Sequence, residues 1–296
     1  MGRSQNSCLI CPGSSKALCH GGDFSRTHSE PMTHYAGLKD KIAANFTASA
    51  PFYDHYAVLQ QQAAKSLVTR LEALKGQIPT GPLLEVGCGT GAVSLALASM
   101  LPHRRLTLID LAPGMIAYNR SALAPLLASR PAHVDWQVCD AETISNQSTY
   151  ALITSCLTLQ WLHDLPRALD RLCSALVPDG ILICSYLGDR SFPEWQQAAE
   201  SCGLAYTANP LPNSQQTLAH ALPLGHLAST EEELVTISYS SVLDFFRSLK
   251  KTGTSTPTST NRLSRRDMAR LITGWQRQAG TPVPVTYQIN TLLVRR

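Results

Sequence analysis

Residues 83–91 constrain this chain more than any other stretch, because an apolar run leads there directly into three closely spaced glycines. Residues 83–86 predict a buried strand, and Gly87, Gly89 and Gly91 allow the backbone to turn tightly and to approach a ligand closely. A helical pattern at 92–100 and a second strand pattern ending in Asp110 follow. This order of elements predicts a binding site for a nucleotide-type cofactor.

Strand and helix patterns continue to alternate after this loop. Alternation of this kind predicts a parallel sheet with helices on both faces. A helix with a leucine-rich stripe is expected ahead of the loop at about 54–74, and the end of the chain adds strands at 232–239 and 285–294. The other expected strands are 106–110, 134–138, 150–155 and 181–186, and the other expected helices are 114–127, 166–176, 193–201, 242–249 and one beginning after Ser264.

Composition excludes several classes of protein. Hydrophobic residues make up 44% of the chain and charged residues 16%, which is typical of a globular protein with a large core. The net charge of +4 is too small to indicate nucleic-acid binding by itself. There is neither an apolar run long enough to span a membrane nor a secretory signal pattern, so we expect a cytoplasmic protein with reduced cysteines.

Residues 1–34 differ from the rest because they lack apolar periodicity and are rich in Gly, Ser, His and Cys. We interpret them as a flexible N-terminal extension of a domain that covers 35–296. Cys8, Cys11, Cys19 and His20 could be combined into a zinc site, but a second ligand pair with suitable spacing is missing. The composition therefore favours an extension without a metal.

Two cofactor classes compete for the glycine loop. Gly87, Gly89 and Ala92 also satisfy the dinucleotide pattern, and a carboxylate at Asp110 could accept both ribose hydroxyls of NAD or of S-adenosylmethionine. Asp110 could equally cap the following helix. The glycines and Asp110 alone do not separate the two cofactors.

Two further acids favour S-adenosylmethionine. Glu85 precedes the loop, and Asp140 follows the third strand, with Ala141 behind it. A pyrophosphate would be repelled by an extra carboxylate near the helix N-terminus, whereas a sulfonium and an ammonium would be attracted. Asp140 could accept a hydrogen bond from the adenine amine, or it could be a solvated loop acid. Glu85 would be costly to bury without a partner.

At this point the sequence resembles the class I S-adenosylmethionine-dependent methyltransferases. Within them it resembles the malonyl-acyl-carrier-protein O-methyltransferases of biotin synthesis over about 35–296, with Thr252-Gly253-Thr254 where that family has an I-G-A turn. The matching residues are Phe46, Ala50, Tyr53, Asp54, Ala57, Leu59 and Gln60 of the N-terminal signature, Leu159-Gln160-Trp161, Ser185-Tyr186-Leu187-Gly188, Ser248-Leu249-Lys250 and the Tyr287 segment.

The resemblance implies a Rossmann-like sheet, mostly parallel with an antiparallel C-terminal strand, and a lid-like insertion at about 187–230. It implies methylation of the free carboxylate of a malonyl group on acyl-carrier protein, or on malonyl-CoA, without a metal. It assigns a catalytic role to Tyr53 and substrate binding to Gln160, Trp161 and Lys250. The cofactor-binding residues implied are Glu85, Gly87, Gly89, Gly91, Asp110, Asp140 and Ala141.

The acceptor leaves alternatives open. A basic group should pair with the substrate carboxylate, and Lys250, Arg247 and Arg190 are candidates. Another small carboxylate or a quinone-type acceptor is the main alternative substrate, and an NAD-dependent oxidoreductase or a non-catalytic cofactor-binding module is the alternative class. A docking face for the acidic carrier protein is expected from Lys250, Lys251, Arg262, Arg265, Arg266 and Arg270, which could also be a solvated surface.

Overall fold

The computed structural model describes residues 32–129, 133–145, 147–258 and 261–296. The expected N-terminal extension therefore lies outside the described residues, except that its last three positions belong to helix α1 (Met32–Ser49). The cysteines and histidine weighed as zinc ligands also lie outside them. Within the described ranges, no helix is both long and apolar enough to cross a membrane.

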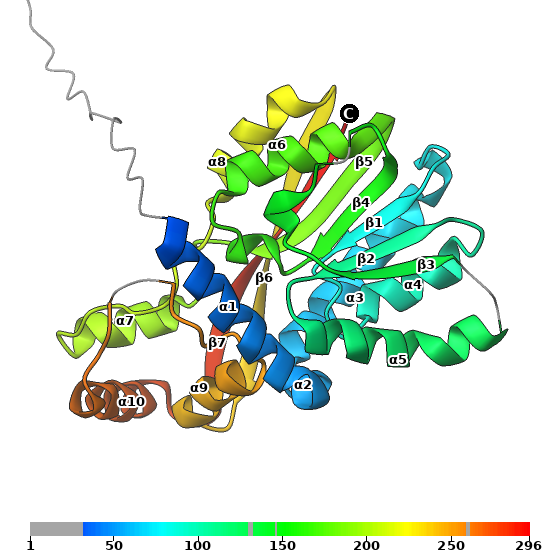
Figure 1. The fold of residues 1–296 in the computed structure, drawn as a ribbon. Helices are drawn as coiled ribbons and strands as arrows, with labels where there is room; N and C mark the ends of the chain where they lie inside the picture. Colours follow the sequence, from blue (N-terminus) through cyan, green and yellow to red (C-terminus); the bar gives the residue numbers. More distant parts are fainter. Residues whose placement is uncertain (1–31, 130–132, 146, 259–260) are drawn as a thin grey trace, which may run out of the picture.

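One seven-stranded sheet organises the molecule (Figure 1). Five strands are parallel, and the C-terminal strand β7 runs antiparallel to both of its neighbours. The predicted sheet of a Rossmann-like class I fold is therefore confirmed. In spatial order the strands are β3 (Val134–Val138), β2 (Leu106–Asp110), β1 (Leu83–Val86), β4 (Tyr150–Cys156), β5 (Leu176–Leu187), β7 (Val283–Arg295) and β6 (Leu227–Tyr239).

Helices cover both faces of the parallel strands, which explains why β1 and β4 are apolar almost throughout. On one face, Leu83, Leu108 and Leu152 pack against α3 (Val58–Leu74), α4 (Ala92–Met100) and α5 (Pro113–Ser129). On the other face, Leu84 and Ile153 pack against α6 (Leu165–Ala175), with α8 (Ser214–Ala221) beside it. The two apolar layers fix the loops at the carboxyl ends of the strands.

A third apolar cluster lies at the end of the sheet where β6 and β7 continue past β5. The first half of β7 pairs with β6 alone, so the two strands extend as a ribbon past β5. The helices α7 (Pro193–Ser201), α9 (Val242–Lys251) and α10 (Arg265–Ala279) surround this ribbon (Figure 1). Trp195, Phe245 and Trp275 form its aromatic centre. The expected insertion at about 187–230 contains α7 and α8.

The N-terminal part of the described chain differs from the sequence prediction. Helix α1 was not predicted, and the expected helix at 54–74 is interrupted at Ala57, so that α2 (Tyr53–Tyr56) and α3 are separate helices. Helix α1 packs against α5 and leads into α2 through one 3-10 turn, η1 (Ala50–Phe52). The remaining 3-10 turns are η2 (Lys75–Gln77), η3 (Ala141–Thr143), η4 (Leu159–Trp161) and η5 (Leu222–Leu224).

Candidate functional site

The glycine loop joins β1 to α4, and its backbone explains the choice of residue. Gly87, Gly89 and Gly91 have φ angles of 67°, 49° and 107°, a region that side chains with a Cβ rarely adopt. A Cβ on Gly87 would lie 2.0 Å from the Thr158 hydroxyl oxygen, so this position has no room for a side chain. The space in front of Gly89 is open. The loop is thus packed behind Gly87 and accessible at Gly89.

A cavity lies in front of this loop, where the neighbouring parallel strands end. Its lining includes Gly87, Gly89, Asp110, Asp140 and Ala141, which brings five of the seven predicted cofactor-binding residues together. Gly91 does not line it and instead precedes the first residue of α4. Ligands of open α/β sheets bind at this edge, and we refer to this space as the cofactor cavity.

Asp110 connects the end of β2 to the loop. Its Oδ2 accepts a hydrogen bond from the Gly89 amide at 3.0 Å, and its Oδ1 accepts one from the Ala112 amide at 2.8 Å. Burial raises the pKa of this carboxyl group, and the two amides oppose that shift. Each carboxylate oxygen retains a lone pair, so Asp110 could fix the loop and still accept a hydroxyl.

Glu85 lies behind the loop and is only 2% exposed. The Ser94 hydroxyl donates to its Oε2 at 2.6 Å, and the same hydroxyl oxygen accepts a hydrogen bond from Asn119 at 2.9 Å. Burial raises the pKa of Glu85 to about 8. From the sequence we expect Glu85 to neutralise the cofactor cations directly or through water, but the structure places it outside the lining of the cavity, so this role remains a prediction.

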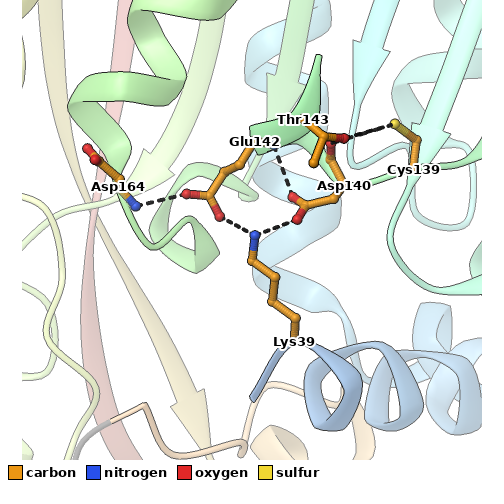
Figure 2. A network of polar contacts seen from close by, with 6 residues as sticks. All are labelled: Lys39, Cys139, Asp140, Glu142, Thr143 and Asp164. Atoms are coloured by element: carbon orange, nitrogen blue, oxygen red, sulfur yellow. Dashed lines mark hydrogen bonds and ion pairs between the residues drawn. The ribbon is translucent and has the colours of Figure 1, made fainter. Parts of the chain in front are cut away.

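A three-residue network closes the far side of the cofactor cavity (Figure 2). The Asp140 Oδ1 accepts a hydrogen bond from the Glu142 amide at 3.0 Å, and its Oδ2 pairs with the ammonium of Lys39. The same ammonium lies 2.5 Å from Oε2 of Glu142. Neither Lys39 nor Glu142 was predicted. Glu142 follows Ala141 directly in the sequence. Nothing in the sequence links Asp140 or Glu142 to Lys39, which lies about one hundred positions earlier.

A second, larger cavity of about 370 Å³ lies next to the first. It is lined by apolar, aromatic and neutral polar side chains from α2, α3, α9, the β6–β7 ribbon and the loop before α10. Within the described part of the chain, Arg262 is the only lysine or arginine in its lining, and that lining contains no carboxylate. We call it the acceptor cavity.

Four side chains line both cavities: Phe46, Tyr53, Leu157 and Trp161. Phe46 and Trp161 meet edge to face, with ring centroids 5.4 Å apart. Burial, together with nearby Cys156 and Asp110, raises the pKa of Tyr53, so its phenol stays protonated. These four side chains form a wall shared by the two cavities, and the wall contains the predicted Tyr53 and Trp161.

The remaining predicted acceptor residues separate into two groups. Gln160 lines the acceptor cavity and donates to the Leu157 carbonyl at 2.8 Å. Lys250 is exposed on α9 and does not line the cavity, and neither do Arg190 and Arg247, which pair with Glu232 and Asp244. The basic lining residue is Arg262, which the sequence analysis had assigned to the docking face.

The Thr252-Gly253-Thr254 turn, where the sequence departs from the family pattern, also contributes to the acceptor cavity. Both threonines line it, and their hydroxyl oxygens lie 3.0 Å apart. Tyr239 and Tyr287 supply two further hydroxyls, 2.6 Å apart. The lining thus combines apolar walls with neutral hydrogen-bonding groups.

The cofactor cavity fits S-adenosylmethionine. Its described lining presents the carboxylates of Asp110, Asp140 and Glu142 against the single ammonium of Lys39, an excess that suits a cationic ligand. The open space at Gly89 gives a ligand access to the loop backbone. A pyrophosphate would meet these carboxylates unfavourably.

Comparisons with known proteins agree with the geometry. Residues 83–180 match the family model described as a methyltransferase domain. A malonyl-[acyl-carrier protein] O-methyltransferase of Bacillus cytotoxicus is 31% identical over 225 residues, covering 73% of this chain and 76% of that protein. One of Hahella chejuensis is 30% identical over 269 residues, covering 87% and 91%. The biotin biosynthesis bifunctional protein BioCD of Bordetella avium is 36% identical over 217 residues.

That last match covers 73% of this chain and 44% of the bifunctional protein, so the chain spans less than half of that relative. Among solved structures, the YcgJ protein of Bacillus subtilis matches with a TM-score of 0.57 at 13% identity, covering 78% of this chain and 98% of that one. This structural match supports the fold alone. The sequence matches show more: the chain belongs to the malonyl-[acyl-carrier protein] O-methyltransferase family of S-adenosylmethionine-dependent methyltransferases.

Proposed function

We propose that this protein transfers a methyl group from S-adenosylmethionine to the free carboxylate of a malonyl thioester on acyl-carrier protein, giving the methyl ester that begins biotin-precursor synthesis. The observation that carries the proposal is the wall shared by the cofactor and acceptor cavities. Relatives named malonyl-[acyl-carrier protein] O-methyltransferase support the choice of acceptor.

The chemistry requires placement more than proton transfer. When bound, S-adenosylmethionine supplies an electrophilic methyl group whose leaving group is a neutral thioether. A carboxylate is already ionised near neutral pH, so the chain needs no general base. Phe46 and Trp161 keep the wall apolar, which removes water from the attacking oxygen, and the protonated phenol of Tyr53 is placed to orient it.

The acceptor cavity suits the arm of a carrier protein. A pantetheine arm is neutral and contains amides, and the lining offers Gln160, Asn209 and the threonines of the 252–254 turn as hydrogen-bonding partners. Arg262 is exposed and could meet an anionic group of the acceptor. These features favour a thioester on a long arm over a quinone-type acceptor, which carries neither amides nor an anion.

Exposed basic residues and free thiols support the proposed partner and compartment. Lys250, Lys251, Arg262, Arg265, Arg266 and Arg270 are all exposed on α9, α10 and the segment between them, which would suit an acidic carrier protein. The six cysteines of the described residues are free thiols, as expected in the cytoplasm.

Incubation with S-adenosylmethionine and malonyl-acyl-carrier protein tests the proposal directly. We expect mass spectrometry to show the gain of one CH₂ unit on the acyl group and release of S-adenosylhomocysteine. Acetyl-acyl-carrier protein is the matched control, because it lacks the free carboxylate and should remain unchanged. Binding of the cofactor without methylation of the malonyl group would contradict the assigned acceptor.

A further inference from the structure

Helix α1 lies against the cofactor cavity but is anchored by few buried apolar groups. Between residues 37 and 49, Ile42 is the only apolar side chain of this helix that is buried, and Phe46 is half-buried. Elements with so little buried apolar surface open more readily than the core. Polar contacts must therefore contribute much of what keeps α1 in place.

Lys39 makes a charged contact of this kind. Its ammonium bridges Asp140 and Glu142, two carboxylates that line the cofactor cavity from the opposite side (Figure 2). Burial alone would lower the pKa of Lys39, but the hydrogen bonds and charges of the two carboxylates outweigh it and raise the pKa. For Glu142, burial raises the pKa, but the contact with Lys39 and the backbone amides of Asp164 and His163 together outweigh burial and lower it. Lys39 and Glu142 are therefore both charged around neutral pH.

The carboxylates are themselves fixed to the sheet side of the molecule. Glu142 accepts a hydrogen bond from the Asp164 amide at 2.9 Å through Oε1, at the beginning of α6. Asp140 accepts the Glu142 amide within η3. Lys39 therefore connects a weakly anchored helix to a firmly anchored loop, and all three residues of the bridge line the cofactor cavity.

The same helix also reaches the acceptor cavity. Phe46 lines both cavities, about two turns beyond Lys39 along α1, and Tyr53 follows after the η1 turn. Asn45 donates to the Thr256 hydroxyl at 2.6 Å, which ties α1 to the loop that borders the acceptor cavity. The position of α1 thus affects the shared wall as well as the cofactor cavity.

We propose that Lys39 is a positioning residue: by bridging Asp140 and Glu142 it latches α1 over bound S-adenosylmethionine, so that the cofactor leaves only when this bridge opens. The inference rests on the proposed use of S-adenosylmethionine and does not depend on the acceptor. In the latched state Phe46 and Tyr53 complete the wall against which the acceptor is placed.

Lys39→Met tests this assignment, because methionine retains most of the side-chain stem and loses only the ammonium. We expect the Kd of S-adenosylmethionine and that of S-adenosylhomocysteine to rise by the same factor, about tenfold. Dissociation of both ligands should accelerate by a similar factor. Stopped-flow fluorescence of Trp161 and the other tryptophans would measure the rate. Lys41→Met is the matched control, since Lys41 is exposed on the same helix and should change neither value.

The equal effect on both ligands separates a latch from a purely electrostatic role. S-adenosylmethionine carries one more positive charge than S-adenosylhomocysteine, so loss of the Lys39 charge alone would favour the first ligand over the second. Such a divergence, or unchanged dissociation rates in Lys39→Met, would overturn the proposal. Lys39→Arg should restore slow dissociation, which a loss of overall folding could not explain.

Failure of the latch and failure of the proposed function would give different binding results. If neither ligand binds the wild-type chain, the proposed methyltransferase function fails. If both bind the wild type and Lys39→Met with the same affinity, only the latch fails. Thermal unfolding of the two methionine variants without ligand should give closely similar midpoints, which shows that the cofactor measurements compare folded proteins.

Discussion

At the scale of single residues, two acids next to the glycine loop have different environments. Asp110 lines the cofactor cavity and holds two backbone amides, whereas Glu85 is buried behind the loop beside Ser94. Side chains alternate between the two faces of a strand, and Glu85 shares the Leu83 face, which is covered by α3 and α4. Their positions in the sequence suggested one role for both, but burial distinguishes them.

Glu85 should make the stability of the ligand-free chain depend on pH. Its pKa is raised to about 8 in the folded chain, from an ordinary value of 4.5, so the folded state binds the proton more tightly. This contribution is complete below the ordinary value and is lost as the pH rises through 8. Its slope is at most about 1.4 kcal/mol per pH unit.

Urea unfolding of the wild type and Glu85→Gln at several pH values tests this linkage. As the pH rises from 5 to 8, the wild type should lose unfolding free energy relative to the glutamine variant. The loss should end near the raised pKa of about 8. Glutamine keeps an oxygen that can accept the Ser94 hydroxyl. A difference that does not change with pH would show that Glu85 ionises normally in the folded chain.

Tyr53 lines both cavities, so its hydroxyl group can be tested directly. Tyr53→Phe keeps the ring in the shared wall and removes only the hydroxyl, so kcat should fall by about tenfold or more while cofactor affinity stays close to that of the wild type. Tyr56→Phe is the control, because Tyr56 lines the acceptor cavity alone. Equal activities of the two variants would contradict a role for the Tyr53 hydroxyl in placing the acceptor.

At the scale of elements, the sheet and the helices that cover it could be predicted, but α1 could not. Strands β1, β2 and β4 are mostly apolar runs between turn signals, and α4 and α7 match their predicted bounds. Helix α1 buries only one apolar residue between 37 and 49, so its sequence lacks the stripe that indicates a packed helix. Its polar contacts to Asp140 and Thr256 join residues that are distant in sequence, and the sequence gives no sign of them.

One hydrogen bond connects α2 to the glycine loop. The Thr90 hydroxyl donates to Oδ1 of Asp54 at 2.6 Å, and Asp54 adjoins Tyr53. Thr90→Val should therefore lower kcat by severalfold through a displaced Tyr53 and reduce the unfolding free energy by about 1 kcal/mol. Steady-state kinetics and urea unfolding would measure both, with Thr69→Val on the exposed face of α3 as the control. Full activity in Thr90→Val would show that α2 is held by other contacts.

At the scale of the whole molecule, the acceptor cavity is the feature least accessible to sequence analysis. Its lining comes from α2, the segment after β4, the loop before α8, α9, the 252–263 segment and β7. Only the folded β6–β7 ribbon and its helices bring these segments together. The resemblance identified Tyr53, Gln160 and Trp161, whereas Arg262 at the cavity and Lys250 outside it became distinguishable only in three dimensions.

The exposed arginines of α10 lead to a prediction about the whole substrate. Ser264 caps this helix by accepting the Asp267 amide at 3.1 Å, and Asp267 also pairs with Arg270, so part of the positive charge is already neutralised. Arg265 and Arg266 are exposed at the start of the helix, next to the segment that contributes Arg262 to the acceptor cavity. A carrier protein whose arm enters the cavity would approach this surface.

Replacing Arg265 and Arg266 by glutamate should therefore raise KM for malonyl-acyl-carrier protein by about tenfold, because the reversed charges repel an acidic partner. The value of kcat and the use of malonyl-CoA should change little, since neither arginine lines the cavity. The control exchanges Lys65 and Lys75 for glutamate, an identical change of charge on exposed residues that lie outside the cavity lining.

Added salt should weaken wild-type binding of the carrier substrate and reduce the difference from the arginine variant, because screening acts on exposed charges. If the arginine variant used malonyl-CoA equally poorly, the effect would lie within the cavity. If the lysine variant showed the same rise in KM, the effect would be one of net charge. Either result would exclude α10 as the docking surface.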